Sequence, residues 1–387
     1  MTSTASEASG SVRLALGGDV MAGRGIDQIL PHPSDPLLYE SSVTSALDYV
    51  ELAEMVHGPI PRPADFAYPW GDALDALARA AVDARIVNLE TSVTRSASPW
   101  PKGINYRMSP ENLPCLTAAE ISGCALANNH TLDWGETGLL ETVDALSRAG
   151  IVSTGAGRDR AHAEAPAVIA IPGKGRVLLF SFGSSSSGIP PEWAAGEGHP
   201  GLDLLPDLSG RTVDRIAERV RAVRRGGDLV VASIHWGANW GYSVPRDQRL
   251  FARALIERAG IDLIHGHSSH HPKGVEVHRG KAIVYGCGDL LNDYEGIAGH
   301  EEFRDDLTVI YLAGLDPLTG RLTTLELLPL RITRFRLHRA TASEARWLRD
   351  LFSREGARFG TRAELTAGRT IELRWDRAAD RPAARPS

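Results

Sequence analysis

Six separate apolar runs in this 387-residue chain each end in a residue that can bind a metal ion. The runs are LALGG, IVNL, CALA, DLVVASI, DLI and AIVYGCG. The residues that follow these runs include Asp19, Glu90, Asn129, His130, His235, His267, His270 and Asp289. If the runs are strands of an α/β sheet, their ends meet at one edge, and these side chains can converge on one site.

The rest of the pattern supports such a fold, because short apolar runs alternate with helical periodicity. Strands are expected at Val12–Gly17, Arg85–Asn88, Ala125–Ala127, Val177–Gly183, Leu229–Ile234, Asp262–Ile264, Ala282–Tyr285 and Leu307–Leu312. Helices are expected at Asp72–Ala84, Thr137–Ala149, Val213–Arg224, Gln248–Ala259 and Ser343–Phe352. This alternation predicts a layered α/β fold. A long insertion, Pro31–Trp70, interrupts it, and loops of that length are often functional.

Composition excludes several classes of protein. Hydrophobic residues make up 43% of the chain, enough for a sizeable core, and the net charge is -6. A nucleic-acid partner is not expected, because the one basic run, Arg211–Arg225, has the apolar spacing of a solvated helix. Three widely spaced cysteines without a CxxC pair predict neither a disulfide framework nor a thiolate zinc site.

Targeting signals are also absent from the pattern. The start MTSTASEASG lacks a positive region and an apolar run, and no stretch reaches the length of a membrane span. We therefore expect a cytoplasmic protein with no direct membrane insertion. Residues 1–10 and 376–387 are expected to be disordered, since they are rich in small residues, proline and charge.

The combination of carboxylate, amide and imidazole groups favours Mn, Fe or Zn over Ca or Mg, which prefer oxygen ligands. Each residue also has a simpler interpretation: a single Asp after a strand is usually a cap, and Asn128-Asn129 could be a turn. Four histidines within seven residues, in a chain with 13, are harder to explain in this way. The sequence has no GxxxxGK[ST] nucleotide loop and no HExxH helix. The segment Gly183–Gly188, GSSSSG, is too long for a GxSxG elbow, but its backbone N–H groups could face an anion.

The motifs GDVM, NLE, NNHTLDWG, HWG and GHSSHHPKGVEVHRGKAIVYGCGD occur in this order between about Val12 and Asp306. In order and spacing they resemble those of the CapA-like proteins of poly-γ-glutamate capsule synthesis. That family in turn resembles the calcineurin-like metallophosphoesterases. The resemblance implies a metallophosphoesterase-like β-sandwich flanked by helices, with one or two divalent metal ions at the strand ends.

Carried over residue by residue, the resemblance implies a set of metal ligands and a proton donor. The implied ligands are Asp19, Glu90, Asn129, His235, His267 and His270. His130 matches a histidine that stays off the metals and protonates the leaving group, and Asp133 could orient its ring. Arg24, Lys102 and Arg107 are candidates to bind an anionic substrate, although surface charge explains them equally well.

Two departures from the metallophosphoesterase pattern concern the metals. Met21 stands where those enzymes have a histidine ligand, and a thioether binds hard divalent ions poorly. Glu90 stands where they have the shorter aspartate that bridges two metals. We therefore expect one ion to bind more weakly than the other, or only one ion to bind.

The expected function is that of a metal-dependent hydrolase with an anionic small molecule or a γ-glutamyl polymer as substrate. The bond could be a phosphoester or a γ-glutamyl amide. The alternative is a non-catalytic accessory factor for capsule polymer assembly. We divide the chain into a metallophosphoesterase-type domain, 11–335, and a C-terminal extension of helix and strand, 336–375.

Overall fold

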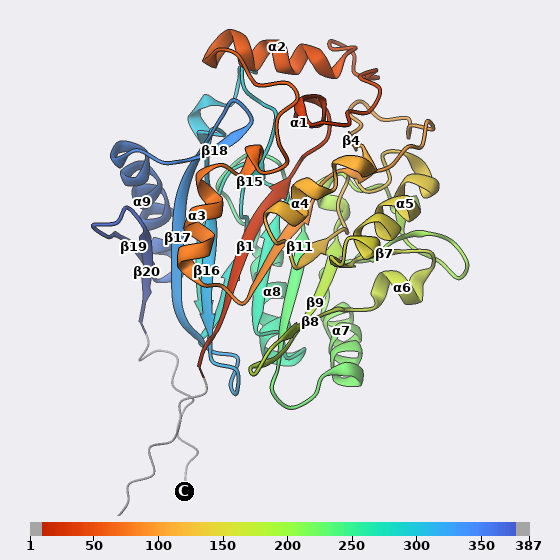
Figure 1. Ribbon diagram of the computed structural model, residues 1–387. Helices are drawn as coiled ribbons and strands as arrows, with labels where there is room; N and C mark the ends of the chain where they lie inside the picture. Colours follow the sequence, from red (N-terminus) through yellow and green to blue (C-terminus); the bar gives the residue numbers. More distant parts are fainter. Residues whose placement is uncertain (1–9, 377–387) are drawn as a thin grey trace, which may run out of the picture.

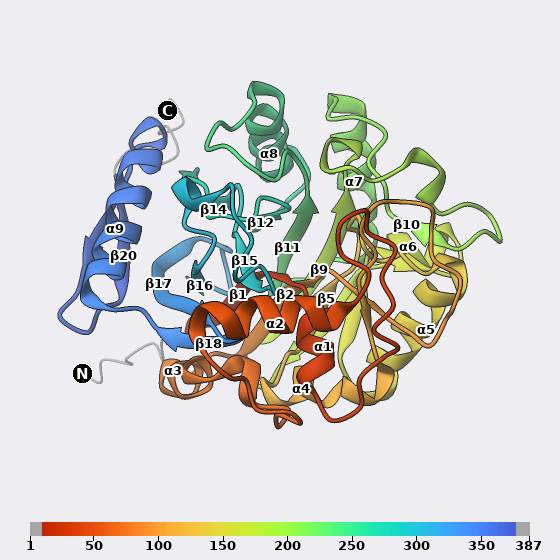
Figure 2. The same cartoon turned by 90° about the horizontal axis from the view of Figure 1, so that it is seen from above.

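The computed structural model describes residues 10–376. The predictions of disorder for 1–10 and 376–387 therefore fall almost wholly outside the described residues. Two large β-sheets form the centre of the molecule, with helices on their outer faces (Figures 1 and 2). The expected layered α/β fold is confirmed at this level.

The first sheet has ten strands. In spatial order they are β19 (Thr361–Leu365), β20 (Ile371–Trp375), β17 (Leu322–Thr333), β16 (Leu307–Leu315), β1 (Val12–Val20), β2 (Ala84–Leu89), β5 (Gly123–Ala125) and β6 (Val152–Thr154), with β15 (Asp289–Leu291) beside β1 and β18 (Arg336–Arg339) beside β17. Strands β1, β2, β5, β6 and β15 run parallel to one another. Their carboxyl ends therefore share one edge of the sheet.

The second sheet has six strands. In spatial order they are β13 (Val275–His278), β14 (Lys281–Val284), β12 (Leu263–His267), β11 (Asp228–His235), β9 (Gly175–Gly183) and β8 (Ala167–Ile171). Strands β9, β11, β12 and β14 are parallel. Two short pairs join β10 (Gly201–Leu202) to β7 (Ala156–Gly157) and β3 (Ser92–Val93) to β4 (Arg107–Met108).

The helices of the described residues flank the two sheets or lie at the top of the molecule (Figure 1). They are α1 (Gly25–Ile29), α2 (Ala46–His57), α3 (Asp72–Ala80), α4 (Pro114–Ala118), α5 (Gly135–Arg148), α6 (Arg160–Glu164), α7 (Gly210–Val223), α8 (Arg246–Arg258) and α9 (Ala342–Gly356). Short 3₁₀ turns span Tyr68–Trp70, Pro110–Asn112, Ser185–Ser187, Pro191–Trp193, Glu301–Phe303 and Ala357–Phe359. In Figure 2, α3 and α4 lie on one side of the sheets and α7 and α8 on the other.

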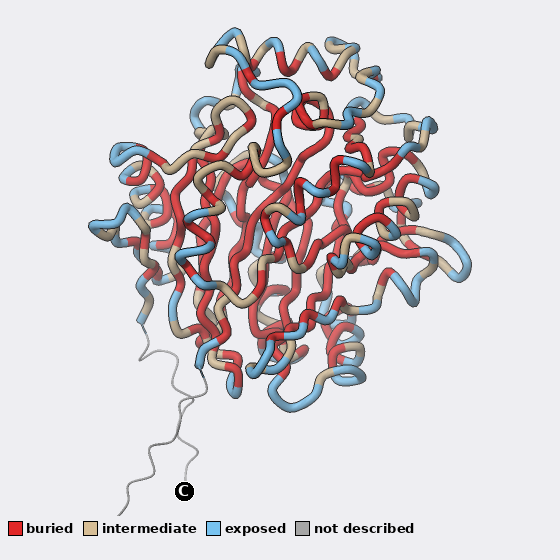
Figure 3. Tube along the Cα trace, in the orientation of Figure 1, coloured by how far each residue is buried: buried red, intermediate tan, exposed pale blue. Residues whose placement is uncertain are grey.

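In the part of the chain that the structure describes, the buried apolar side chains form three large clusters and a small fourth one at Leu38, Ala46 and Tyr49. The large clusters explain this layering. Leu14 and Leu16 of β1 point toward the second sheet and pack in one cluster with Val231 and Leu263, whereas Ala15 points to the helices. This alternation is the two-residue period of a strand buried on both faces. Buried backbone accordingly runs through both sheets, and exposed segments lie at the periphery (Figure 3).

The expected helices and strands are present with different bounds. For one helix, the backbone conformation explains the difference. The helix expected over Asp72–Ala84 ends at Ala80, because Ala81 adopts a left-handed conformation with φ 49°. Asp83 N–H then donates to Arg13 O, and Ala84 starts β2. The alanine-rich sequence continues the helical pattern past this turn, so the pattern overstated the helix.

The insertion Pro31–Trp70 contains α2, which the sequence pattern did not predict. Helix α2 lies across the top of the molecule, beyond the carboxyl end of β1 (Figures 1 and 2). It buries Tyr49 and Val50 but exposes Met55 and Val56. Apolar residues on both faces blur the periodicity by which an amphipathic helix is recognised.

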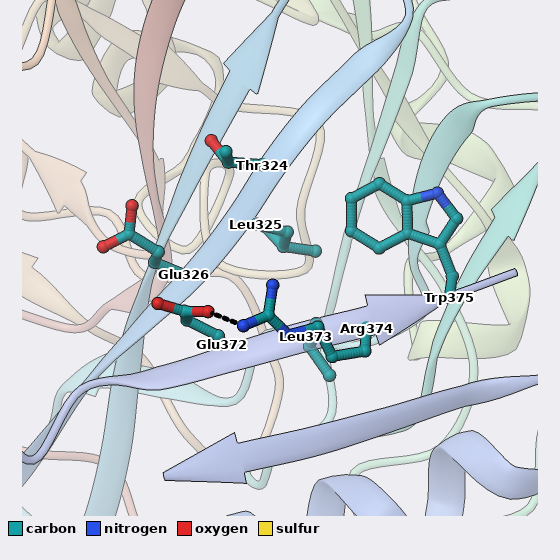
Figure 4. A pocket seen from close by; sticks show the side chains of 7 residues that line it. All are labelled: Thr324, Leu325, Glu326, Glu372, Leu373, Arg374 and Trp375. Carbon is teal, nitrogen blue, oxygen red and sulfur yellow. Dashed lines mark ion pairs between the residues drawn. The ribbon is translucent and has the colours of Figure 1, made fainter. Parts of the chain in front are cut away.

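Part of the C-terminal extension joins the first sheet. Strand β20 pairs with β17 at Glu326↔Glu372 and Leu327↔Ile371. The first of these pairs helps to line a pocket, shown in Figure 4, whose lining residues are Thr324, Leu325, Glu326, Glu372, Leu373, Arg374 and Trp375. Arg374 forms an ion pair with Glu372 there. None of these lining residues is among the candidate ligands, so this pocket is separate from the candidate site.

Candidate metal centre

Residues at the ends of strands from both sheets bring three candidate ligands together. Asp19 is the next-to-last residue of β1, and His235 and His267 are the last residues of β11 and β12. All three side chains are buried. Gly18 allows β1 to approach closely here, since a Cβ at this position would overlap the carbonyl oxygen of Gly288.

The first group of ligand atoms comes from Asp19, His235 and His267. One ligand atom from each lies within 4.8 Å of the other two. The Nδ1 atoms of His235 and His267 are 2.8 Å apart, and His267 Nδ1 is 3.9 Å from Asp19 Oδ1. A carboxylate and two imidazoles at this spacing can bind one divalent ion, whose ligands lie at about 2.0–2.2 Å.

The second group comes from Asp19, His270 and Asp289, whose ligand atoms also lie within 4.8 Å of one another. His270 Nδ1 is 2.8 Å from Asp289 Oδ1. Asp289 starts β15 and is the neighbour of Asp19 in the ladder between β1 and β15. Because Asp19 belongs to both groups, the two groups are adjacent.

Buried carboxylates give these groups a negative potential. Burial, together with the nearby Asp289 carboxylate, raises the pKa of Asp19 to about 7. Burial also raises the pKa of Glu90 well above its usual value, and Asp19 and Asp289 add to this shift. A bound cation would relieve this repulsion, so the donor set fits a divalent metal ion.

The two imidazoles of the first group are held in the neutral form, which is the form that binds metals. Burial lowers the pKa of His235 and of His267 well below the usual value. His270 differs: burial opposes its protonated form, but Asp289 and Asp19 outweigh burial and raise its pKa. Since a metal binds only neutral imidazole, an ion that binds His270 must displace one proton from the protonated ring.

Glu90 lies between the first group and His130. Its Oε1 is 4.0 Å from His235 Nε2 and 3.8 Å from His130 Nε2. The Asn88 side-chain amide donates to Asp19 Oδ1 at 2.8 Å and to Glu90 Oε2 at 3.2 Å. Asn88 therefore holds the two carboxylates together.

Asn129 and His130 approach the same place from the loop after β5. Asn129 Oδ1 is 2.9 Å from His235 Nε2. His130 Nδ1 is 2.6 Å from Asp133 Oδ2. Burial lowers the pKa of His130 to about 4, although the Asp133 carboxylate acts in the opposite direction. Neutral His130 therefore donates its Nδ1–H to Asp133 and leaves Nε2 unprotonated on the side of Glu90.

Lys102 lies beside this pair. Its Nζ is 2.6 Å from Asp133 Oδ1 and 3.3 Å from His130 Nδ1, and it donates to the carbonyl oxygen of Asn129. The side chain is 23% exposed. It thus puts a positive charge next to His130 at a place that solvent reaches.

Comparison with known proteins identifies the family. Residues 13–294 match the family described as bacterial capsule synthesis protein PGA_cap. The chain belongs to the PGA_cap family. The resemblance found in the motifs is thereby confirmed, and the matched segment contains every residue of the two ligand groups.

Two relatives illustrate the range of PGA_cap proteins. A probable polyglutamine synthesis accessory protein of Mycobacterium tuberculosis is 48% identical over 364 residues, which cover 94% of this chain and 96% of the relative. The PGA biosynthesis protein CapA of Bacillus subtilis is 23% identical over 296 residues, covering 76% of this chain and 66% of the relative. Within residues 10–376 of this PGA_cap protein, no helix combines the length and apolar composition needed to cross a membrane.

Two predicted substrate-binding residues of this PGA_cap protein already have partners within the protein. Arg24 is buried, where its guanidinium bonds to both Asp293 oxygens and to Glu40 Oε1. Arg107 donates to backbone oxygens at Ser96 and Asp35. Neither residue forms a hydrogen bond or ion pair with His130 or Asp133, in contrast to Lys102.

The sequence pattern left Asp289 and Asn88 outside the proposed ligand set. Asp289 carried a signal, because it follows an apolar run as Asp19 does. Asn88 carried a weaker one: it lies two residues before Glu90 near the end of β2, a spacing that puts both side chains on one face of a strand. Met21 is buried near the second group, with its Sδ 3.6 Å from Tyr294 Oη.

Proposed function

We propose that this protein is a metal-dependent hydrolase that acts on an anionic substrate in poly-γ-glutamate capsule synthesis. The observation that carries the proposal is the His130–Asp133 pair, which lies next to Glu90 on the side of the first group of metal-binding side chains. A structural metal site needs no proton-transfer residue next to it. A hydrolytic site does, because the leaving group must be protonated.

The proposed ligands are Asp19, Glu90, Asn129, His235, His267 and His270, to which we add Asp289. Two sheets with ligands at their strand ends also favour the metallophosphoesterase-like arrangement. A divalent Mn, Fe or Zn ion held there would supply Lewis-acid activation of water and neutralise developing negative charge. Asp19 belongs to both groups, so it is the residue through which a second ion would be coupled to the first.

His130 would transfer the proton to the leaving group. Asp133 holds the ring by accepting from Nδ1, so Nε2 is the atom available to a substrate near Glu90. In the free protein Nε2 is unprotonated, since the pKa of His130 is about 4. An anionic group bound beside the ring raises that pKa, because it favours the charged imidazolium. Substrate binding would thus prepare His130 as a general acid.

Lys102 would help to bind the substrate, since its ammonium group lies next to His130 and is partly exposed. Arg107 remains a more distant candidate beside a surface pocket that it lines together with Asp35 and Glu111. For Arg24 we propose a supporting role, because its buried guanidinium packs against the rings of Tyr49 and Tyr106 as well as bonding Asp293.

The substrate class follows from the relatives. The B. subtilis relative is named for PGA biosynthesis, and the M. tuberculosis relative is named an accessory protein for polyglutamine synthesis. We therefore propose a γ-glutamyl amide or a phosphoester of polymer synthesis as the bond cleaved. The word accessory in the second name favours one alternative, a non-catalytic assembly factor in which the metal site serves structure or binding.

Metal analysis followed by turnover assays would separate these two functions. The purified protein is loaded with Mn, and its hydrolysis of p-nitrophenyl phosphate, a phosphodiester and γ-glutamyl-p-nitroanilide is measured. Turnover that needs added metal and is lost in Glu90→Ala supports the hydrolase. Stoichiometric metal with no turnover of any of these substrates favours the assembly factor.

A further inference from the structure

A chain of hydrogen bonds runs behind His267, on the side away from the other ligands of its group. His265 Nε2 is 2.8 Å from the carbonyl oxygen of Gly17, and His265 Nδ1 is 2.9 Å from Ser233 Oγ. Ser233 Oγ is in turn 2.8 Å from His267 Nε2. The three side chains are buried, and Ser233 and His265 are direct neighbours across β11 and β12.

The direction of each hydrogen bond follows from the first. A backbone carbonyl only accepts, so His265 must carry its proton on Nε2. His265 is fully buried, and among the described residues its ring nitrogens bond only Gly17 O and Ser233 Oγ, so no carboxylate compensates a charge on the ring. A neutral ring is therefore favoured, and its Nδ1 can only accept. Ser233 therefore donates its hydroxyl proton to His265. The lone pairs that remain on Ser233 Oγ accept a hydrogen bond from the Nε2–H of His267.

This order of donors fixes the tautomer of His267. With its proton on Nε2, the ring presents the Nδ1 lone pair toward Asp19 Oδ1, 3.9 Å away, and His235 Nδ1, 2.8 Å away. Without the chain, a neutral histidine in water carries either tautomer, and only one of them could bind a metal at Nδ1.

We propose that Ser233 and His265 are positioning residues that select the Nε2–H tautomer of His267, so that Nδ1 is the metal-binding atom. This inference rests on the proposed function, because the tautomer has a use only if a metal binds. The tautomer itself is a property of the metal-free protein. The chain begins at Gly17, two residues before Asp19 in β1, and ends at His267 in β12. It therefore orients the imidazole relative to the strand that supplies the carboxylate of the same group.

A role in core packing alone explains the polar side chains of Ser233 and His265 less well. A hydroxyl and an imidazole at the buried interface between β11, β12 and β1 each cost desolvation unless they are hydrogen-bonded. Apolar residues would fill the same space without that cost, as they do at Val231 and Leu263 in the same strands. Instead, both ring nitrogens of His265 form hydrogen bonds, and the Ser233 hydroxyl connects this ring to the proposed ligand His267.

The tautomer can be read directly by ¹⁵N NMR of the imidazole nitrogens in the metal-free protein, with His267 assigned by comparison with His267→Gln. In the wild type we expect the proton of His267 on Nε2. In Ser233→Ala the ring loses its acceptor, so a mixture of tautomers is expected. Affinity for Mn and Zn, measured by calorimetry, should fall 10- to 100-fold, as is usual when the partner of a ligand is removed.

Conservative variants and a matched control separate this effect from general destabilisation. Ser233→Thr keeps the hydroxyl, and His265→Gln keeps one acceptor and one donor, so both should retain the wild-type tautomer and most of the affinity. Thr361→Val is the control, because it removes another buried hydroxyl, which donates to Val275 O at 2.8 Å in a different part of the sheets. It should leave tautomer and affinity unchanged.

The outcomes also distinguish this inference from the proposed function. A wild-type protein with the proton of His267 on Nδ1, or a Ser233→Ala variant with unchanged tautomer and metal affinity, would overturn the inference. A wild type with the Nε2–H tautomer that is lost in Ser233→Ala, but with no affinity for Mn or Zn, would support the tautomer selection and remove the proposed function.

Discussion

Asp19 and Asp289 are direct neighbours across the parallel pair of β1 and β15, and both carboxylates belong to the second group of candidate ligands. Asp19 also belongs to the first group, with His235 and His267. The two groups therefore share one carboxylate and differ in every other member. This arrangement predicts how single substitutions should divide the metal content.

Asp19→Asn should remove metal from both groups, because it weakens the ligand that they share. His235→Ala should affect only the first group, and Asp289→Asn only the second. Metal per chain, measured by atomic emission after loading with Mn or Zn, should thus fall further in Asp19→Asn than in either other variant. Equal metal loss in all three would mean that the ligands form one indivisible site.

Bound metal should also stabilise the fold, since it binds only the native arrangement of ligands. At a free ion concentration of about 100 times the dissociation constant, the free energy of unfolding should rise by roughly 2.7 kcal/mol. Thermal unfolding with added Mn and then with excess chelator measures this difference. The shift should shrink in Asp19→Asn, and a shift of the same size in that variant would place the binding elsewhere.

Met21→His should raise metal stoichiometry or affinity, because it restores an imidazole where metallophosphoesterases have one. The side chain lies by Tyr294, whose ring is 5.3 Å from that of His270. Met21→Leu is the matched control and should bind metal as the wild type does. Unchanged metal binding in Met21→His would mean that another residue already acts as the ligand in this place. His271 would be the first residue to test, although its Nδ1 lies 3.1 Å from Pro272 O.

The sequence allowed the strand ends to be predicted because the pattern that marks them is local. A short apolar run followed by Asp19 or His235 can be recognised without knowing its neighbours. The pairing of Asp19 with Asp289 is different: β15 has only three residues, and its place beside β1 depends on the close approach at Gly18. Such a contact between distant segments leaves no periodic signal.

Arg24 shows that the partners of a charged residue likewise cannot be predicted from the sequence alone. From the sequence it is equally a surface charge or a substrate ligand. Its partners, Glu40 and Asp293, are 16 and 269 residues away along the chain. Only the folded arrangement reveals that its donors are used inside the protein. Lys102 was predicted together with Arg24 on the same grounds, yet it lies beside His130.

Lys273 provides a test by pH at a residue outside the ligand set. Burial, with a smaller contribution from Arg358, lowers the pKa of Lys273 from 10.5 to about 8. Between these values the unfolded chain binds more protons, so this residue makes stability rise as the pH rises from 8 to 10.5. Below pH 8 the folded protein bears the full cost of the buried charge.

Lys273→Met should therefore stabilise the protein at pH 7, by roughly 3 kcal/mol at most, and most of this gain should be gone by pH 10. Urea unfolding of the variant and the wild type at both pH values measures the difference, and other titrating groups cancel between the two proteins. A gain that is the same at pH 7 and pH 10 would show that packing of the methionine, rather than the charge, is responsible.

His130→Ala tests the catalytic part of the proposed function. General acid catalysis contributes roughly 10²–10⁴-fold, so turnover should fall by about that factor. Metal content should barely change, because His130 Nε2 is 3.8 Å from Glu90 Oε1 and its Nδ1 is used by Asp133. Glu90→Ala should behave differently, since it removes a proposed ligand: metal and activity should fall together.

The surface pair of His162 and Asp159 supplies a matched control for His130→Ala. There too a histidine Nδ1 lies close to an aspartate three residues away, at 2.7 Å, but the pair is exposed. His162→Ala removes an equivalent hydrogen bond and should leave turnover and metal unchanged. If His130→Ala strips the metal, His130 is a ligand and its assignment as the acid is wrong. If metal and every measured activity survive His130→Ala, the side chain that sets a hydrolase apart from an assembly factor has no catalytic use, and the accessory function is the better account of the site.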